Sequence, residues 1–400
     1  MTLFAILVLA ATMQTPPPAW VQHGPDGAIA RVIIEDGGKC PPLVLDGREH
    51  EMRVHSSPAE NYEVTVCEAP LPAVRSASIS GTELPAEKLR RPERIVLIGD
   101  TGCRRKAGGK PQDCKDPKQW PFATMAASIA EWNPDAIIHV GDYYYREATS
   151  CTATTCTGTT YNWQRWKADF FTPAAPLLAK APWVFVRGNH EECGRAAEGW
   201  VRFLDPHNYV WENDQTCTSN IDLTPPYRVS LGGMEVAVLD SSAAKDSSKK
   251  QSAFFAGQLG VLDVKPGAWL VLHHPFWAMD YTDPATETMW DAWQQAGSTA
   301  TDPLALVISG HIHLLETLSF TDGKTPQVVA GNGGTSLDGA PTNGQGMNIG
   351  GRTVANFMAQ ESFGYITATR SGEGWTFEVR NPDGTPRTKC AVTVQSVVCN

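Results

Sequence analysis

Five short segments of this 400-residue sequence carry side chains that can bind metal ions, and each segment follows an apolar run. In chain order they are Gly99-Asp100-Thr101-Gly102, Gly141-Asp142-Tyr143-Tyr144-Tyr145, Gly188-Asn189-His190-Glu191, Leu272-His273-His274-Pro275 and Gly310-His311-Ile312-His313. Carboxylate oxygen suits hard cations, and imidazole suits zinc, iron and related ions. The chemistry that these residue types could support is therefore the binding of metal ions and reactions at a bound metal.

Each segment alone also has an ordinary structural explanation. A Gly-Asp pair after a strand is usually a turn or a helix cap, and His273-His274 could be a packed pair at a strand end. His311 and His313 are a stronger signal, because alternation along an extended chain puts both imidazoles on one side. The occurrence of all five segments in order, each at the end of an apolar run, predicts one shared site.

The elements that must position these segments alternate between buried strands and amphipathic helices. Apolar runs predict strands over residues 94–100, 135–142, 183–187, 235–239, 268–273 and 304–309, and apolar residues at helical spacing predict a helix over 122–129 that Asn133-Pro134 ends. Such alternation is typical of an α/β sheet. In open α/β sheets, ligands bind outside the carboxyl ends of the strands, where all five segments lie.

Residues 21–90 have a different pattern, with short runs of β-branched residues between glycine, proline and aspartate breaks. This pattern predicts a small β-rich region. Leu84–Pro92 has the composition of a linker out of it. We therefore expect a leader over residues 1–20, an accessory domain over 21–90 and a catalytic domain over 91–400.

The start of the chain and the cysteines predict export to the periplasm or outside the cell. The first apolar run is about nine residues long, which fits a signal peptide and is far short of a membrane span. No Lys or Arg precedes it, and a buried N-terminal strand is the alternative. The ten cysteines suggest disulfides between neighbours, namely Cys40–Cys67, Cys103–Cys114, Cys151–Cys156, Cys193–Cys217 and Cys390–Cys399. A zinc site is the competing use of these cysteines, although the sequence contains no Cys-x-x-Cys.

The acidic composition excludes some functions. The chain has 33 Lys or Arg against 43 Asp or Glu, a net charge of −10. A protein of this sign is a poor candidate for tracking nucleic acid or an anionic membrane. Chemistry on phosphate would need a local positive charge, and bound metal ions would supply it.

The ordered segments resemble the motifs of the calcineurin-like metallophosphoesterase superfamily over roughly residues 94–340. Most members have a histidine two residues after the first aspartate, whereas this chain has Gly102 there. Tyr145, three residues after Asp142, is similar to the tyrosine of the purple acid phosphatase branch. The resemblance implies a four-layer α/β/β/α sandwich after the small β-rich N-terminal domain, with Gly331–Gly334 as a closing turn.

The same resemblance implies a site for two metal ions bridged by Asp142. The first ion would be bound by Asp100, Asp142, Tyr145 and His313, and the second by Asp142, Asn189, His273 and His311. The oxygen-rich first set suits Fe(III), and the second set suits Zn, Mn or Fe(II). These two ions are the expected cofactors.

Other residues near the motifs also have expected roles. The resemblance makes His190 a catalytic residue that faces the leaving-group oxygen, as an acid or an electrostatic partner. His274 could contact substrate, or it could pack or support the ligands. Arg146 and Arg195 could bind phosphate, but we expect salt bridges from both. Asp240 ends a similar strand, and we expect a structural role for it.

Together these observations predict an exported hydrolase that uses a hydroxide bridging two metal ions to attack phosphomonoesters in line. A phosphodiesterase or nucleotide hydrolase with the same metal site is the alternative, because ligand sets do not encode pocket size. A metal-binding surface protein without activity is a third hypothesis. The expected partner is a small phosphorylated substrate; we expect no nucleic-acid tracking and, after loss of the leader, no membrane span.

Overall fold

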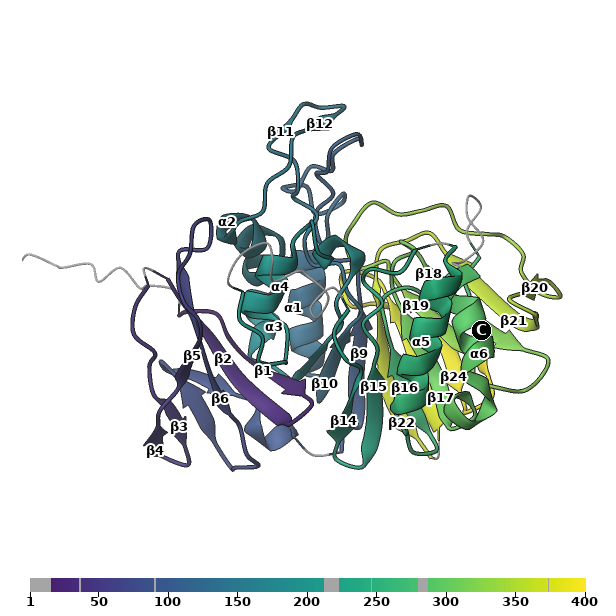
Figure 1. The fold of residues 1–400 in the computed structure, drawn as a ribbon, viewed down its shortest axis with the longest axis horizontal. Helices are drawn as coiled ribbons and strands as arrows, with labels where there is room; N and C mark the ends of the chain where they lie inside the picture. The colour runs from purple at the N-terminus through teal and green to yellow at the C-terminus, as the bar shows by residue number, and fades with distance from the viewer. Residues whose placement is uncertain are drawn as a thin grey trace, which may run out of the picture.

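The computed structural model describes residues 16–35, 37–89, 91–211, 223–245, 247–279, 287–372 and 374–400. Most of the predicted leader therefore lies outside the described residues. Two large sheets face each other, and helices cover their outer faces (Figure 1).

The first sheet has eleven strands and contains the strands that lead to the first three motifs. In spatial order they are β25 (Val397–Cys399), β24 (Pro386–Val392), β23 (Gly374–Arg380), β22 (Tyr365–Ser371), β9 (Arg94–Ile98), β10 (Ala136–His139), β13 (Trp183–Phe185), β1 (Ala19–Gly24), β2 (Gly27–Glu35), β6 (Val64–Pro70) and β5 (Arg53–Ser56). Strands β9, β10 and β13 are parallel neighbours, so the motifs after them meet at one edge.

The second sheet has eight strands and leads to the two histidine motifs. Its spatial order is β14 (Tyr227–Leu231), β15 (Met234–Val238), β16 (Ala268–Val271), β17 (Leu304–Ser309), β19 (Gln327–Ala330), β18 (Leu315–Phe320), β21 (Arg352–Gln360) and β20 (Asn348–Ile349). The neighbours β15, β16, β17 and β19 are parallel, which brings the ends of β16 and β17 together.

The remaining elements are two small sheets and the helices. The small sheets are β4 (Arg48–His50), β3 (Leu43–Leu45), β7 (Ala77–Ile79) and β8 (Thr82–Leu84), and the pair β11 (Ser150–Cys151) and β12 (Cys156–Thr157). The helices are η1 (Ala86–Lys88), α1 (Phe122–Trp132), α2 (Trp163–Trp166), the π-helix η2 (Lys167–Phe171), α3 (Thr172–Leu178), η3 (Asn189–Glu191), α4 (Ala197–Phe203), α5 (Lys249–Val261) and α6 (Glu287–Thr301). No helix in the described ranges is long and apolar enough to cross a bilayer.

Three apolar cores separate four layers, as the predicted sandwich requires. Alternate residues of β9 divide between two of them: Ile95 and Leu97 face the second sheet, whereas Val96 and Ile98 face the core beneath α1 and α3. The third core lies between the second sheet and the helices α5 and α6. Figure 1 shows these two groups of helices on opposite parts of the molecule. The predicted α/β class and its layers are confirmed.

The β-rich N-terminal region contributes to two different sheets. Strands β1, β2, β6 and β5 extend the first sheet, with Gln22 of β1 opposite Trp183 of β13, whereas β3, β4, β7 and β8 form a sheet of their own. Ala19 and Trp20 belong to β1, although the predicted leader included both. The domain boundary near residue 90 stays a prediction, and the first sheet runs through both sides of it.

Four of the five predicted disulfides are confirmed. They are Cys40–Cys67, Cys103–Cys114, Cys151–Cys156 and Cys390–Cys399. Cys193 is also disulfide-bonded, and its predicted partner Cys217 lies outside the described residues. Every described cysteine is in a disulfide, which excludes the alternative of a cysteine zinc site for this part of the chain.

Candidate metal centre

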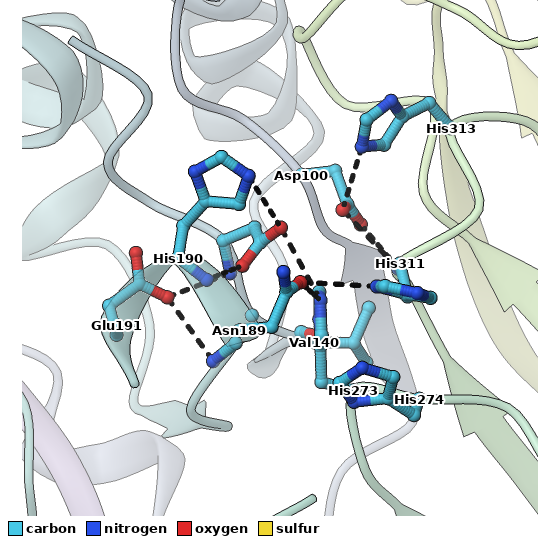
Figure 2. A network of polar contacts seen from close by, with 12 residues as sticks. Asp100, Val140, Asn189, His190, Glu191, His273, His274, His311 and His313 are labelled. Carbon is cyan, nitrogen blue, oxygen red and sulfur yellow. Dashed lines mark hydrogen bonds and ion pairs between the residues drawn. The ribbon is translucent and has the colours of Figure 1, made fainter. Parts of the chain in front are cut away.

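The carboxyl ends of five strands bring all seven predicted metal ligands into one cluster. Strands β9, β10 and β13 lead to Asp100, Asp142 and Asn189, and β16 and β17 lead to the histidines. Figure 2 shows the side chains of Asp100, Asn189 and the histidines of the cluster pointing toward one another. One ligand atom from each of Asp100, Asp142 and His273 lies within 4.8 Å of the others.

Strained backbone conformations mark three of these residues. Asp100, Asp142 and His311 have φ angles of 56°, 59° and 72°, in the left-handed region that side chains other than glycine rarely adopt. Such a conformation costs on the order of 1 kcal/mol or more for each residue and persists where the surrounding structure imposes it. These three backbone conformations therefore lower the stability of the fold and direct the three side chains toward the cluster.

Tyr145 occupies space that a side chain at position 102 would block. A Cβ atom added to Gly102 would lie 2.7 Å from Cδ2 of the Tyr145 ring, closer than real contacts allow. The tyrosine hydroxyl lies 2.6 Å from Oδ2 of Asp142, 2.8 Å from Nε2 of His313 and 3.5 Å from Oδ1 of Asp100. The position of the Tyr145 ring therefore requires a glycine at position 102.

A second group of contacts gathers around Asn189. Its Oδ1 lies 2.9 Å from Nε2 of His273 and 3.1 Å from Nδ1 of His311 (Figure 2). Nε2 of His273 is also 3.4 Å from Oδ2 of Asp142. Nδ1 of His273 lies 2.8 Å from the Val140 carbonyl oxygen, to which its N–H donates a hydrogen bond. Because that hydrogen bond fixes the tautomer, Nε2 presents a lone pair to the cluster.

The orientation of the Asn189 amide depends on whether the cluster holds a cation. With its oxygen toward the cluster, Asn189 faces the ring nitrogens of His273 and His311. Turned around, its nitrogen would donate to both histidines and to Oδ2 of Asp142, 3.3 Å away. Three acceptors aimed at one point require either a donor or a cation, and with a cation there the amide oxygen is the atom that binds it.

The electrostatics also fit cations. Burial and the neighbouring Asp142 carboxylate raise the pKa of Asp100 well above its usual range. Burial and the nearby His274 and His273 imidazoles lower the pKa of His311. Among the described residues, no Lys or Arg forms an ion pair with Asp100 or Asp142. Buried carboxylates with neutral imidazoles and no counter-ion are suited to metal ions.

His190 is held beside this cluster by three groups. Its backbone N–H donates to Oδ1 of Asp142 at 2.9 Å. Its Nδ1 lies 3.1 Å from Oε1 of Glu147 and 2.6 Å from Nη2 of Arg195, and those two residues form an ion pair. Its Nε2 is 4.0 Å from Oδ2 of Asp142. The imidazole is therefore clamped through Nδ1, and Nε2 faces the side on which the ligands lie.

The remaining sequence-predicted residues take supporting positions. Arg195 pairs with Glu147 and Arg146 pairs with buried Asp169, so the expected salt bridges are confirmed for both arginines. Oδ2 of Asp240 accepts hydrogen bonds from the backbone and hydroxyl of Thr224, which agrees with its expected structural role.

His274 lies next to His311, with their ring centroids 4.0 Å apart. Burial and the neighbouring His273 lower its pKa to about 3, so the ring is neutral at neutral pH. Nδ1 of His274 is buried and has no hydrogen-bond partner among the described residues. The position fits both expectations for His274, a substrate contact and a packed support.

Several supporting residues were not singled out from the sequence. Glu191 accepts hydrogen bonds from four backbone N–H groups, and Glu147, Asp338 and the Val140 carbonyl each hold a histidine of the cluster. Glu191 lies inside the third motif, and this position in the sequence could have indicated its role. The other three act through geometry that no local sequence pattern encodes.

Comparisons with known proteins show a family and similar folds. The family model described as calcineurin-like phosphoesterase matches residues 93–315. Among solved structures, one of PhoD is similar, with 14% sequence identity over 96% of this chain and 90% of that chain and a TM-score of 0.54. Another, described as GAP50, the anchor in the inner membrane complex of Plasmodium, has 12% identity over 77% of this chain and 90% of that chain and a TM-score of 0.43. No curated protein sequence matches this chain.

Proposed function

Because the chain belongs to the calcineurin-like phosphoesterase family, we propose that it is an exported phosphatase that hydrolyses small phosphomonoesters at a two-metal site. The family makes the chain a metal-dependent hydrolase of phosphoester bonds. The observation that carries the finer proposal is the convergence of seven oxygen and nitrogen ligands on one cluster. In the part of the chain that the structure describes, no Lys or Arg forms an ion pair with either aspartate of this cluster. Four disulfides support export, because such bonds persist in oxidising compartments.

The contacts support the division of ligands between two ions. Asp100, Asp142, Tyr145 and His313 contact one another, and Asp142, Asn189, His273 and His311 form the neighbouring group. Asp142 belongs to both groups. When bound, the two ions would supply positive charge for the phosphate oxygens and lower the pKa of a water. The Val140 carbonyl holds the His273 ring in the orientation that this requires, and Asp338 accepts a hydrogen bond from the backbone N–H of His313.

His190 has the position of a proton donor to the leaving group. Glu147 and Arg195 hold Nδ1 and restrain the ring, and among the described residues no group forms a hydrogen bond with Nε2. A histidine so placed can stabilise or protonate the departing alkoxide, which is worth about 10²- to 10⁴-fold in rate.

The activity is tested with the full chain loaded with metal, on 4-nitrophenyl phosphate and on bis(4-nitrophenyl) phosphate. We expect the monoester to be hydrolysed faster, and His190→Ala to slow its turnover at least about a hundredfold. The His190→Ala protein, purified identically, controls for contaminating phosphatases. Faster turnover of the diester would favour the phosphodiesterase alternative, and no turnover of either ester would refute the proposal.

The identity of the first ion is tested by colour. Since a phenolate bound to Fe(III) gives a visible charge-transfer band, we expect the oxidised protein to absorb visible light and Tyr145→Phe to lose that band. The Tyr143→Phe variant is the matched control, because the Tyr143 hydroxyl bonds to the carbonyl oxygen of Val186, outside the cluster. A colourless protein that contains two Zn or Mn ions by elemental analysis would exclude iron and leave the two-metal site standing.

A further inference from the structure

The loop after the first motif concentrates positive charge that the acidic chain otherwise lacks. Residues 103–118 contain six Lys or Arg and two Asp, in a chain whose net charge is −10. The neighbouring segment over residues 149–160 has no charged side chain. The positive charge is therefore a local property of this loop.

Backbone hydrogen bonds fix this loop against the second motif. The N–H of Arg105 donates to the Tyr145 carbonyl at 2.9 Å, and the N–H of Ala148 donates to the Arg105 carbonyl at 2.8 Å. The Cys103–Cys114 disulfide closes its base. Farther out, the N–H of Gly108 donates to the Cys156 carbonyl, in the β11–β12 hairpin that projects at the top of Figure 1. The basic loop is thus fastened directly beside Tyr145.

Arg104 and Lys106 are half-buried cations that have no ion-pair partner among the described residues. The Arg104 guanidinium is near enough to Tyr145 and His313 to interact with both electrostatically, which puts it beside the cluster. Within the described ranges neither side chain forms a hydrogen bond or an ion pair. Burial lowers the pKa of Lys106, and the charges of Arg104 and Arg195 lower it further, against the opposing effect of the Glu147 and Asp142 carboxylates. Like charges that no ion pair neutralises cost free energy, and a bound anion would reduce that cost.

We propose that Arg104 and Lys106 bind a second negatively charged group of the substrate, a carboxylate or phosphate apart from the phosphate that is hydrolysed. The site would then prefer phosphorylated acids and bisphosphorylated molecules over phosphate esters of neutral alcohols. That the substrate carries a phosphate to be hydrolysed is inferred from the proposed phosphatase function. That it carries a second negatively charged group is inferred from the basic loop alone.

The test compares the binding of two phosphonates that cannot be hydrolysed. 4-Carboxyphenylphosphonate and 4-carbamoylphenylphosphonate have nearly the same size and differ by one charge. Titration calorimetry of the metal-loaded full chain should give about tenfold tighter binding of the carboxylate compound. The double variant Arg104→Gln/Lys106→Gln should reduce this preference to about twofold or less. The double variant Lys115→Gln/Lys118→Gln removes the same charge from exposed positions of the same loop and should keep the preference.

Turnover of the corresponding aryl phosphates separates this inference from the proposed function. Equal binding of the two phosphonates by the wild type, or a preference that survives Arg104→Gln/Lys106→Gln, would overturn the inference even if both phosphates are hydrolysed. If neither phosphate is hydrolysed but the charge preference is present and disappears in that variant, the anion site stands and the phosphatase proposal fails.

Discussion

Asp142→Asn is expected to remove both metal ions together and to lower phosphatase turnover by about a thousandfold or more. The Asp142 side chain contacts Tyr145 of one ligand group and His273 of the other. An amide has no negative charge and can offer only one oxygen, so it cannot bridge two cations. Elemental analysis and turnover of 4-nitrophenyl phosphate measure the two effects.

The loss should be chemical rather than structural. Asparagine tolerates the left-handed backbone that Asp142 adopts, so the substitution adds no new strain. Asp263→Asn is the matched control, because Asp263 has the same kind of backbone, with φ 43°, but is exposed and lies outside the cluster. An Asp142→Asn protein that retained two tightly bound ions would refute the bridging role.

The sequence was sufficient to predict the central strands and the layers around them. Buried parallel strands read as continuous apolar runs, and one of the predicted strands, over residues 304–309, has the bounds of β17. Strand β1 was missed because its segment begins in the predicted leader and contains Gln22 and His23. Both are buried in the fold, and the Gln22 amide donates to the Leu204 carbonyl, 182 residues away. Pairing across such a separation leaves no local pattern.

The candidate metal ligands could be predicted from the sequence more completely than the groups that orient them. Ligands come from motifs with fixed spacing, so resemblance and strand order together named all seven side chains that the structure brings together. The groups that orient them include a backbone carbonyl, Val140, and an acid from a distant loop, Asp338. Every residue has a backbone carbonyl, so no residue type in the sequence marks the one that binds a histidine. The contact of Asp338 with His313 exists only once both loops are folded.

Glu191 shows how strongly the site depends on that support, and Glu191→Gln is the second substitution with a large expected effect. Its side chain is fully buried. Oε1 accepts hydrogen bonds from the N–H groups of Tyr143 and Tyr144, and Oε2 accepts from those of Asp142 and Gly188. A carboxylate satisfies all four donors at once. It therefore fixes the turn that carries Asp142 and the turn that precedes Asn189.

In Glu191→Gln, one of the two oxygens becomes an NH₂ group that faces two backbone N–H donors. Because unpaired buried donors cost about 1–3 kcal/mol each, we expect the free energy of unfolding in urea to fall by about 3 kcal/mol. Metal content and turnover should fall as well, since Asp142 loses the contact that holds its backbone. Glu131→Gln, at an exposed position of α1, should change the stability by less than about 0.5 kcal/mol. If Glu191→Gln were as stable as Glu131→Gln and bound both ions normally, the four hydrogen bonds would not be what orients the ligand turns.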